Sequence, residues 1–202
     1  TSGTGTEGTD YSTISDITIS AGATTGTSSF TPTDDSVYEG NETGIVAIST
    51  VSGGSATEDG TQSVTITITE NESSPTVTLA TSATSIAENA GSSLTLTATS
   101  SIAADEDITV SISTSGTGTE GTDYSTISDI TISAGATTGT ASFTPSDDSV
   151  YEGNETGIVA ISGVSGADAA ESGSQSVTIT ITENESSPTV TLATSATSIA
   201  EN

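Results

Sequence analysis

The chain has 202 residues, of which 27 are acidic and none is Lys, Arg or His, so its formal net charge is -27. This charge disfavours nucleic acid and anionic lipid as partners, since binding to either needs basic side chains. The sequence contains no apolar run of about eighteen residues, so we expect no membrane insertion. Cys is absent, which excludes disulfides and thiolate metal sites.

The same composition makes a disordered chain the first alternative to consider. Leu, Ile, Val and Phe together fall below about a fifth of the residues, and low apolar content with a high net charge is typical of disorder. However, the apolar residues alternate with polar ones, and the acidic residues cluster where loops are expected. We therefore predict a folded chain, with disorder as the alternative for its metal-free state.

A repeat of 113 residues organises the sequence: Asp10 matches Asp123, and Pro75 matches Pro188. Residues 1–89 align with residues 114–202 without a gap. The copies differ at positions 28, 33, 50, 54, 55, 57, 59 and 61. Most of these differences lie within 54–61, which we interpret as a variable surface loop. A period of this length is the size of a whole domain, so we expect tandem modules.

The tripeptide Ser-Ser-Pro at 73–75 recurs at 186–188 and has the character of a linker. Boundaries there give a partial module (1–74) that holds C-terminal strands, a complete module (75–187), and a stub (188–202) that would be the first strand of the next module. The missing strands of the partial module would belong to a longer chain, or a neighbouring copy would supply them by strand addition.

Alternation with a period of two predicts short strands throughout the complete module. In chain order these are 77–79, 94–98, 108–112, 130–132, 141–143, 159–161 and 177–181. Val, Ile and Leu fall on one face of each strand and Thr or Ser on the other, and Thr suits the solvated face of a sheet. No segment has the 3.6-residue period of a helix. The pattern predicts an all-β module, a β-sandwich.

The most informative stretch is 147–155, Asp-Asp-Ser-Val-Tyr-Glu-Gly-Asn-Glu, which recurs unchanged at 34–42. Its carboxylates repel one another strongly unless a cation lies among them, and no basic side chain is available. Ca²⁺ takes about six to eight oxygen ligands, whereas Mg²⁺ keeps its waters, so we predict a calcium loop. A solvated charge cluster is the alternative. A second cluster at 105–107 is interpreted as an exposed turn in preference to a metal ligand.

Four features together resemble the Calx-beta family: Gly-Thr-Asp-Tyr at 121–124, Phe143, the acidic loop 147–155, and the alternating strand with its acidic tail at 177–185. That family is an immunoglobulin-like β-sandwich found in sodium–calcium exchangers, in an integrin β chain and in tandem on bacterial surface proteins. Many members bind calcium through loops at one end of the sandwich. The resemblance covers the complete module and implies tandem immunoglobulin-like β-sandwich modules of 113 residues.

The resemblance also implies which acidic residues hold calcium. In the complete module they are Glu88, Asp123, Asp147, Asp148, Glu152, Glu155, Glu183 and Glu185. In the partial module the same roles fall to Asp10, Asp34, Asp35, Glu39, Glu42, Glu70 and Glu72, and the stub contributes Glu201. The closing tail is Glu-Asn-Glu where the family often has Asp-rich sequence, which affects the number and affinity of the ions. Gly157 and Gly44 stand where the family usually has an aromatic residue, which predicts a weaker core.

Catalysis is not expected, because the chain has no His, Cys or Lys to act as base or nucleophile. Paired carboxylates can hydrolyse glycosides, but sugar sites usually stack their substrate on aromatic rings, and Trp is absent. We predict a structural repeat module of an extracellular adhesin stalk or surface filament, rigidified by calcium. Its partners would be neighbouring modules or neighbouring copies in a filament, and a host or matrix ligand would bind elsewhere in the protein. The alternative is a calcium-dependent module that binds glycan or protein.

Overall fold

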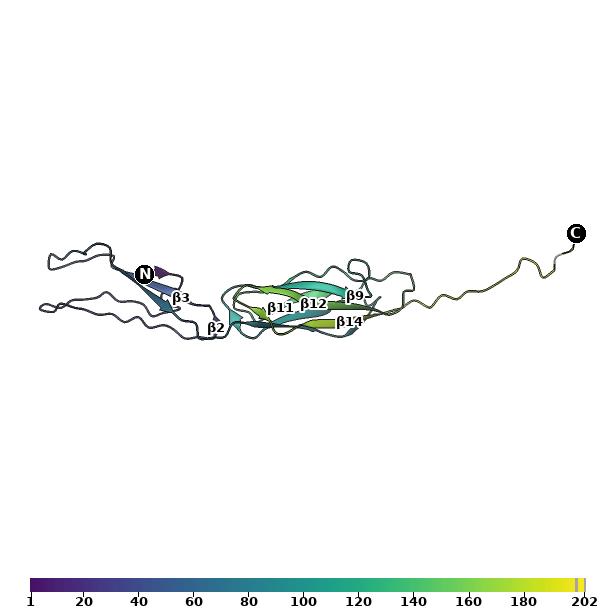
Figure 1. Cartoon of the computed structure of the whole chain (residues 1–202), viewed down its shortest axis with the longest axis horizontal. Helices are drawn as coiled ribbons and strands as arrows, with labels where there is room; N and C mark the ends of the chain where they lie inside the picture. Colours follow the sequence, from purple (N-terminus) through teal and green to yellow (C-terminus); the bar gives the residue numbers. More distant parts are fainter. Residues whose placement is uncertain (199, 202) are drawn as a thin grey trace.

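The computed structural model describes residues 1–198, 200 and 201. The partial module, the complete module and the stub follow one another along the long axis of the chain (Figure 1). Among the described residues, the regular elements are all β-strands. No helix in that part of the chain is long and apolar enough to cross a membrane. The all-β prediction is confirmed.

The larger sheet of the complete module has the strand order β10-β9-β12-β14-β6. Its strands are β6 (Ser85–Ala87), β9 (Ile108–Gly116), β10 (Ile130–Ile132), β12 (Glu155–Ser165) and β14 (Ser176–Thr182). All neighbouring pairs are antiparallel except β14 and β6, which run parallel with Ile181 opposite Ile86. This parallel pair brings the residue after β6 to the same end of the sheet as the residues that follow β14.

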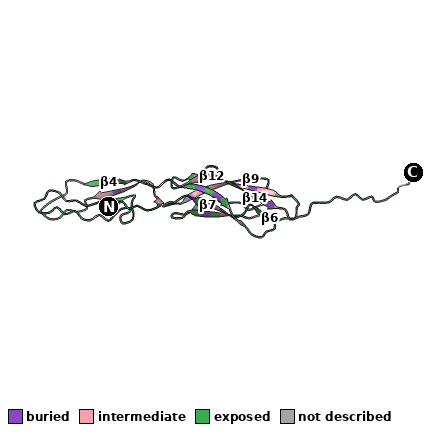
Figure 2. Cartoon of the chain, turned by 90° about the horizontal axis from the view of Figure 1, so that it is seen from below, coloured by how far each residue is buried: buried purple, intermediate pink, exposed green. Residues whose placement is uncertain are grey.

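The smaller sheet has the order β11-β7-β5-β13 and completes the sandwich. Its strands are β5 (Thr76–Thr81), β7 (Leu94–Ser100), β11 (Thr138–Phe143) and β13 (Ala170–Glu171). Val77 and Leu79 on β5 are buried while Thr76, Thr78 and Ala80 are exposed, so the predicted alternation is confirmed. Figure 2 shows the buried residues gathered in the complete module.

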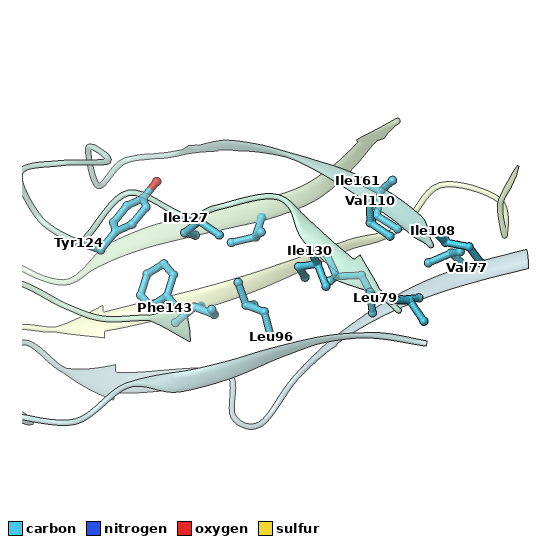
Figure 3. Close-up of a cluster of buried hydrophobic side chains, with 14 of the residues drawn as sticks. Val77, Leu79, Leu96, Ile108, Val110, Tyr124, Ile127, Ile130, Phe143 and Ile161 are labelled. Atoms are coloured by element: carbon cyan, nitrogen blue, oxygen red, sulfur yellow. The ribbon is translucent and has the colours of Figure 1, made fainter. Parts of the chain in front are cut away.

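The core lies between the two sheets and is mostly aliphatic (Figure 3). Tyr124 and Phe143 are the large rings that the complete module contributes, and they stack with centroids 4.6 Å apart. Gly157 borders this pair: a Cβ atom there would lie 2.7 Å from Cε2 of Phe143. The Phe143 ring therefore fills the space that a side chain at 157 would take, and the expectation of a weaker core at Gly157 stays a prediction. Gly44 bears the same relation to Phe30, also at 2.7 Å.

Each strand predicted in the complete module is present, and all except 130–132, which matches β10, lie within a longer observed strand. The alternation did not reveal β6, β8 (Ala103–Ala104) or β13, which are too short to show a period. The stretch 167–174 was expected to be a variable surface loop, like 54–61. In the complete module that expectation is wrong in part, because this stretch contains β13 and buries Ala167.

The partial module holds a sheet of order β1-β3-β4, made of β1 (Ser2–Gly3), β3 (Glu42–Ala47) and β4 (Ser63–Ile68). Its Tyr11 and Phe30 stack with centroids 4.4 Å apart, as Tyr124 and Phe143 do. Strand β2 (Val37–Tyr38) pairs in parallel with β8 of the complete module, and it lies where the two modules meet (Figure 1). The module boundary at residues 74 and 75 stays a prediction.

The described residues of the stub lie extended beyond the complete module (Figure 1). Its Val190 and Leu192 are fully exposed, whereas the matching Val77 and Leu79 are buried in β5. Residues 199 and 202 of this predicted first strand lie outside the described residues. The described part of the stub therefore leaves the prediction of a next module open.

Candidate metal centre at the acidic end

The acidic residues predicted for the complete module gather at the end of the sandwich from which the stub leaves. We call this the acidic end: Glu88, Asp123, Asp147, Asp148, Glu152, Glu155, Glu183 and Glu185. They come from four segments, namely the residue after β6, the turn after β9, the loop between β11 and β12 with the start of β12, and the chain after β14. The sheet topology brings these distant segments together.

Three groups of carboxylates at the acidic end have ligand atoms within 4.8 Å of one another. They are Glu88 with Asp148 and Glu152, Glu88 with Glu183 and Glu185, and Asp123 with Glu152 and Glu155. Two of the groups share Glu88 and two share Glu152, so they form one continuous array of oxygen donors. Asp147 is outside these groups, but its charge raises the pKa of Glu88 and of Glu185.

Glu88 is the buried member of the array, with 8% of its surface exposed. Its amide donates to the carbonyl of Thr182 over 3.0 Å, which extends the β6–β14 pairing by one residue. Its Oε1 accepts a long hydrogen bond from the amide of Asp148 over 3.4 Å. Desolvation raises the pKa of Glu88, and the charges of Glu183, Asp148 and Asp147 raise it further. A group of this kind costs free energy when it is charged, unless a cation compensates it.

Asp123 is positioned by the turn that precedes the buried Tyr124. Its Oδ2 accepts a hydrogen bond from the amide of Thr119 over 2.6 Å. Its carbonyl accepts a hydrogen bond from the amide of Ser146 over 2.9 Å, which ties this turn to the start of the acidic loop. Burial raises the pKa of Glu155, and the neighbouring charges of Asp123 and Glu152 add to that increase. Desolvation, then the charges of Asp123, Asp148 and Glu183, raises the pKa of Glu152.

Glu183 organises the loop through backbone hydrogen bonds. Its Oε2 accepts hydrogen bonds from the amides of Glu152 over 2.6 Å and Gly153 over 2.7 Å. Its Oε1 accepts hydrogen bonds from the amides of Asn184 and Glu185, both over 3.0 Å. Gly153 has a φ of 79°, a conformation that glycine adopts without strain. Hydrogen bonds from Glu185, then Glu152, lower the pKa of Glu183 to about 2. Glu183 is thus charged at neutral pH and fixes the shape of the loop.

Glu185 carries the clearest sign of a missing partner. Its Oε2 is a buried side-chain oxygen without a hydrogen bond. Its pKa is raised to about 7, first by a hydrogen bond with the Glu183 carboxyl, then by burial and by the charges of Glu183, Glu88 and Asp147. A buried carboxylate oxygen normally has a partner. The residues of the acidic end therefore fit a bound cation, which Glu88, Glu183 and Glu185 together would hold.

The partial module repeats this arrangement. Asp10, Glu39 and Glu42 form a group within 4.8 Å. Glu70 takes the role of Glu183: its carboxylate accepts the amides of Glu39, Gly40, Asn71 and Glu72 at 2.6–2.9 Å. Although desolvation opposes it, these hydrogen bonds lower the pKa of Glu70 to about 2. The pKa of Glu39 is raised to about 7, first by desolvation and then by the charges of Asp10 and Glu42.

The other residues predicted for the partial module and the stub lie outside that group. Asp35 accepts a hydrogen bond from the backbone amide of Val37 over 2.7 Å, and Asp34 accepts one from the side-chain amide of Asn71 over 3.0 Å. Glu72 has a raised pKa, first because of its hydrogen bond with Glu70. Glu201 is exposed in the stub, away from the groups of the described residues. The structure thus brings ten of the sixteen predicted ligands into close groups, while Glu201 lies apart from them.

Asp105 is the acidic residue that the sequence reasoning missed as part of a site. The turn 105–107 is exposed, as predicted. However, the amide of Asp105 donates to the carbonyl of Tyr38 in the partial module over 3.1 Å. The Asp105 charge contributes to the raised pKa values of Glu39 and Glu42. The acidic triplet was visible in the sequence, but its position beside another module depends on how the modules dock.

The array offers only oxygen donors, and the chain has no basic side chain to neutralise them. Carboxylates in such numbers suit a hard divalent cation rather than a thiophilic or imidazole-binding metal. No ionisable side chain other than carboxyls and the Tyr hydroxyls is present in the sequence. Clustered carboxylates of this kind can coordinate a hard cation.

Comparison with known proteins agrees with this architecture. The profile of the Calx-beta domain family matches residues 1–72 and again residues 70–185. A search of curated protein sequences found no match. The chain is similar to a solved structure described as the apo form of the Calx CBD1 domain, with 16% identity and a TM-score of 0.45, covering 55% of this chain and 99% of that one. The two profile matches span nearly all of the sequence, and the chain therefore belongs to the Calx-beta family.

Proposed function

We propose that the chain is a run of structural repeat modules from an extracellular adhesin stalk or surface filament, and that calcium at the acidic end of each module stiffens the array. The main support for this proposal is the position of Asp105. Its amide donates to the Tyr38 carbonyl over 3.1 Å, and its charge contributes to the raised pKa values of Glu39 and Glu42, so a carboxylate of one module acts on the cluster of the preceding module. A cation there would interact with both modules at once.

Electrostatics explain why calcium would matter to this chain. Carboxylates that approach within a few ångströms repel each other, and the sequence has no Lys, Arg or His to offset them. An ion that binds the folded state and not the unfolded state adds directly to the free energy of unfolding. The composition, rich in Thr, Ser and Gly and free of Cys, suits a secreted repeat protein at the cell surface, where a host or matrix ligand would bind another part of the protein.

A calcium-dependent glycan- or protein-binding module is the competing function. It would be expected to use the variable loop for recognition. However, in the complete module Asp168 of that loop accepts a hydrogen bond from the Tyr38 hydroxyl of the neighbouring module. This use of the loop supports a role in the array.

Thermal unfolding of the full chain tests the proposal, with separate samples in calcium, in magnesium and in chelator. A ligand at a thousand times its Kd stabilises the folded state by about 4 kcal/mol, which raises Tm by roughly 15 °C for a domain of this size. We expect such a shift with calcium and a much smaller one with magnesium. A melting curve that is the same in calcium and in excess chelator would refute the calcium role.

A further inference from the structure

Tyr38 and Tyr151 are equivalent residues in the two copies of the acidic loop, but their surroundings differ. Tyr38 is 7% exposed, whereas Tyr151 is 43% exposed. Their neighbours differ likewise: Val37 is half-buried and Val150 is 58% exposed. Because the nine residues around each Tyr are identical, the difference comes from what covers them.

The complete module covers Tyr38. Strand β2 pairs in parallel with β8, placing Val37 opposite Ala103 and Tyr38 opposite Ala104. The Tyr38 ring belongs to the same buried cluster as Ala104 and Ala167. The junction between modules is thus an extension of the hydrophobic core of the complete module.

Polar contacts fix the geometry of this junction. The Tyr38 hydroxyl donates to Oδ2 of Asp168 over 2.9 Å and accepts a hydrogen bond from the Ser74 hydroxyl over 3.3 Å. The amide of Asp105 donates to the Tyr38 carbonyl. Both the backbone and the side chain of Tyr38 are therefore engaged across the junction.

We propose that Val150 and Tyr151 form the docking surface for a further copy of the module, which would cover them as the complete module covers Val37 and Tyr38. Residues 188–202 follow this surface and repeat residues 75–89 without a difference, as residues 75–89 follow the surface around Tyr38. The inference adds a partner to the proposed array, and it stands on apolar and hydrogen-bond contacts that need no calcium.

The docked copy would bring two defined groups to this surface. A short strand corresponding to Ala103 and Ala104 would pair with Val150 and Tyr151. An acidic side chain corresponding to Asp168 would accept a hydrogen bond from the Tyr151 hydroxyl. The variable loop would then be the determinant of which modules dock, since position 168 is Asp in one copy and position 55 is Ser in the other.

Nitration of tyrosine with tetranitromethane, followed by mass spectrometry of peptides, tests this surface. In the 202-residue chain we expect Tyr151 to react and Tyr38 to be protected, together with Tyr11 and Tyr124, which are both 1% exposed. Peptides that reach position 33 or 146 separate the two loops, because these positions differ. The second sample is the chain lengthened by a copy of residues 75–187 placed after Ser187, with Phe in that copy at the position of Tyr151.

In the lengthened chain we expect the reactivity of Tyr151 to fall to that of Tyr38. Tyr151 that reacts equally in both chains, while Tyr38 stays protected, would overturn the docking surface. Samples in calcium and in chelator separate this result from the calcium proposal. Protection in both solutions supports docking and shows that calcium is not needed for it. Protection in calcium alone supports the calcium proposal and overturns docking through contacts that need no calcium, and protection in neither refutes docking.

Disulfide cross-linking gives a second measurement that does not depend on tyrosine chemistry. The chain has no Cys, so a pair of introduced cysteines can react only with each other. Val37→Cys with Ala103→Cys is the positive control, since these residues are direct partners. In the lengthened chain, Val150→Cys should cross-link to cysteine placed at the Ala103 position of the added copy. Cross-linking of the control pair alone would contradict the inference.

Discussion

The amide of Glu152 donates a hydrogen bond to the Glu183 carboxylate over 2.6 Å, so a residue after the last strand of the module holds the acidic loop in place. Replacing Glu183 with Ala removes the acceptor for the amides of Glu152, Gly153, Asn184 and Glu185. We expect calcium affinity at the acidic end to fall on the order of 10- to 100-fold, as is common when a group that orients ligands is lost. Isothermal titration calorimetry measures the change.

Asp16→Asn is the matched control, because it removes one charge from an exposed position outside the acidic end. Glu70→Ala should have the mirror effect, weakening the site of the partial module while that of the complete module keeps its affinity. Equal calcium affinity in Glu183→Ala and in the Asp16→Asn control would show that the loop needs no such anchor.

The contact between Gly157 and Phe143 predicts a loss of stability when a methyl group is added. A Cβ at 157 would lie 2.7 Å from Cε2 of Phe143, and overpacking of a core costs about 1–3 kcal/mol. Gly157→Ala should lower the free energy of unfolding by that amount in urea titration.

Gly163→Ala is the control for this substitution, since the nearest atom to its Cβ would be Cβ of Ser111 at 4.0 Å. We expect it to change stability by no more than about 0.5 kcal/mol, as is usual for a surface position. Similar losses in both variants would mean that the Phe143 ring does not depend on the absence of a side chain at 157.

The metal-free chain should be most stable near pH 4.5. Glu39 and Glu185 have pKa values of about 7, above the ordinary 4.5, so the folded state holds protons that the unfolded state releases. Stability therefore falls as pH rises from 4.5 to 7. Glu70 and Glu183 have pKa values of about 2, so stability also falls as pH drops from 4.5 to 2. Urea unfolding across this pH range checks both directions. A steady increase in stability from pH 4.5 to pH 7 would contradict this assignment.

Calcium binding should release protons at pH 6 to 7. A cation binds the ionised carboxylates, and Glu39 and Glu185 retain protons in this range because their pKa values are about 7. Calorimetric titrations in two buffers with different ionisation enthalpies give the number of protons released. We expect release at pH 6.5 and almost none at pH 9; equal heats in both buffers at pH 6.5 would argue against these two residues as ligands.

Asp105→Asn tests the carboxylate that one module adds to the cluster of the preceding one. We expect weaker calcium binding at the junction and unchanged binding at the acidic end of the complete module. The neighbouring Glu106→Gln is the control, because it removes the same charge from the same exposed turn. If the two variants bind calcium alike, Asp105 is no ligand at the junction.

The fold could be predicted from the sequence to a large extent, because alternation of Val, Ile and Leu with Thr and Ser fixes which face of a strand is buried. This is why Val77 and Leu79 were assigned to the core correctly. Strands β6, β8 and β13 have two or three residues and no period to detect. The clustering of Glu88 with Glu183 depends on the parallel pairing of β6 with β14, which alternation does not specify. Sequence spacing likewise did not place Asp105 beside Glu39.

The two copies of the repeat separate what sequence determines from what tertiary structure decides. By itself the sequence determined the local features: the stacked Tyr–Phe pairs and the Glu anchors of the acidic loops form in both copies. A segment's own sequence did not determine whether that segment forms a strand. Ile130 is fully buried in β10, whereas the matching Ile17 is 56% exposed and outside any strand. The physical reason is that a strand needs a partner for its backbone and a facing sheet for its side chains, and β9 provides the partner only in the complete module.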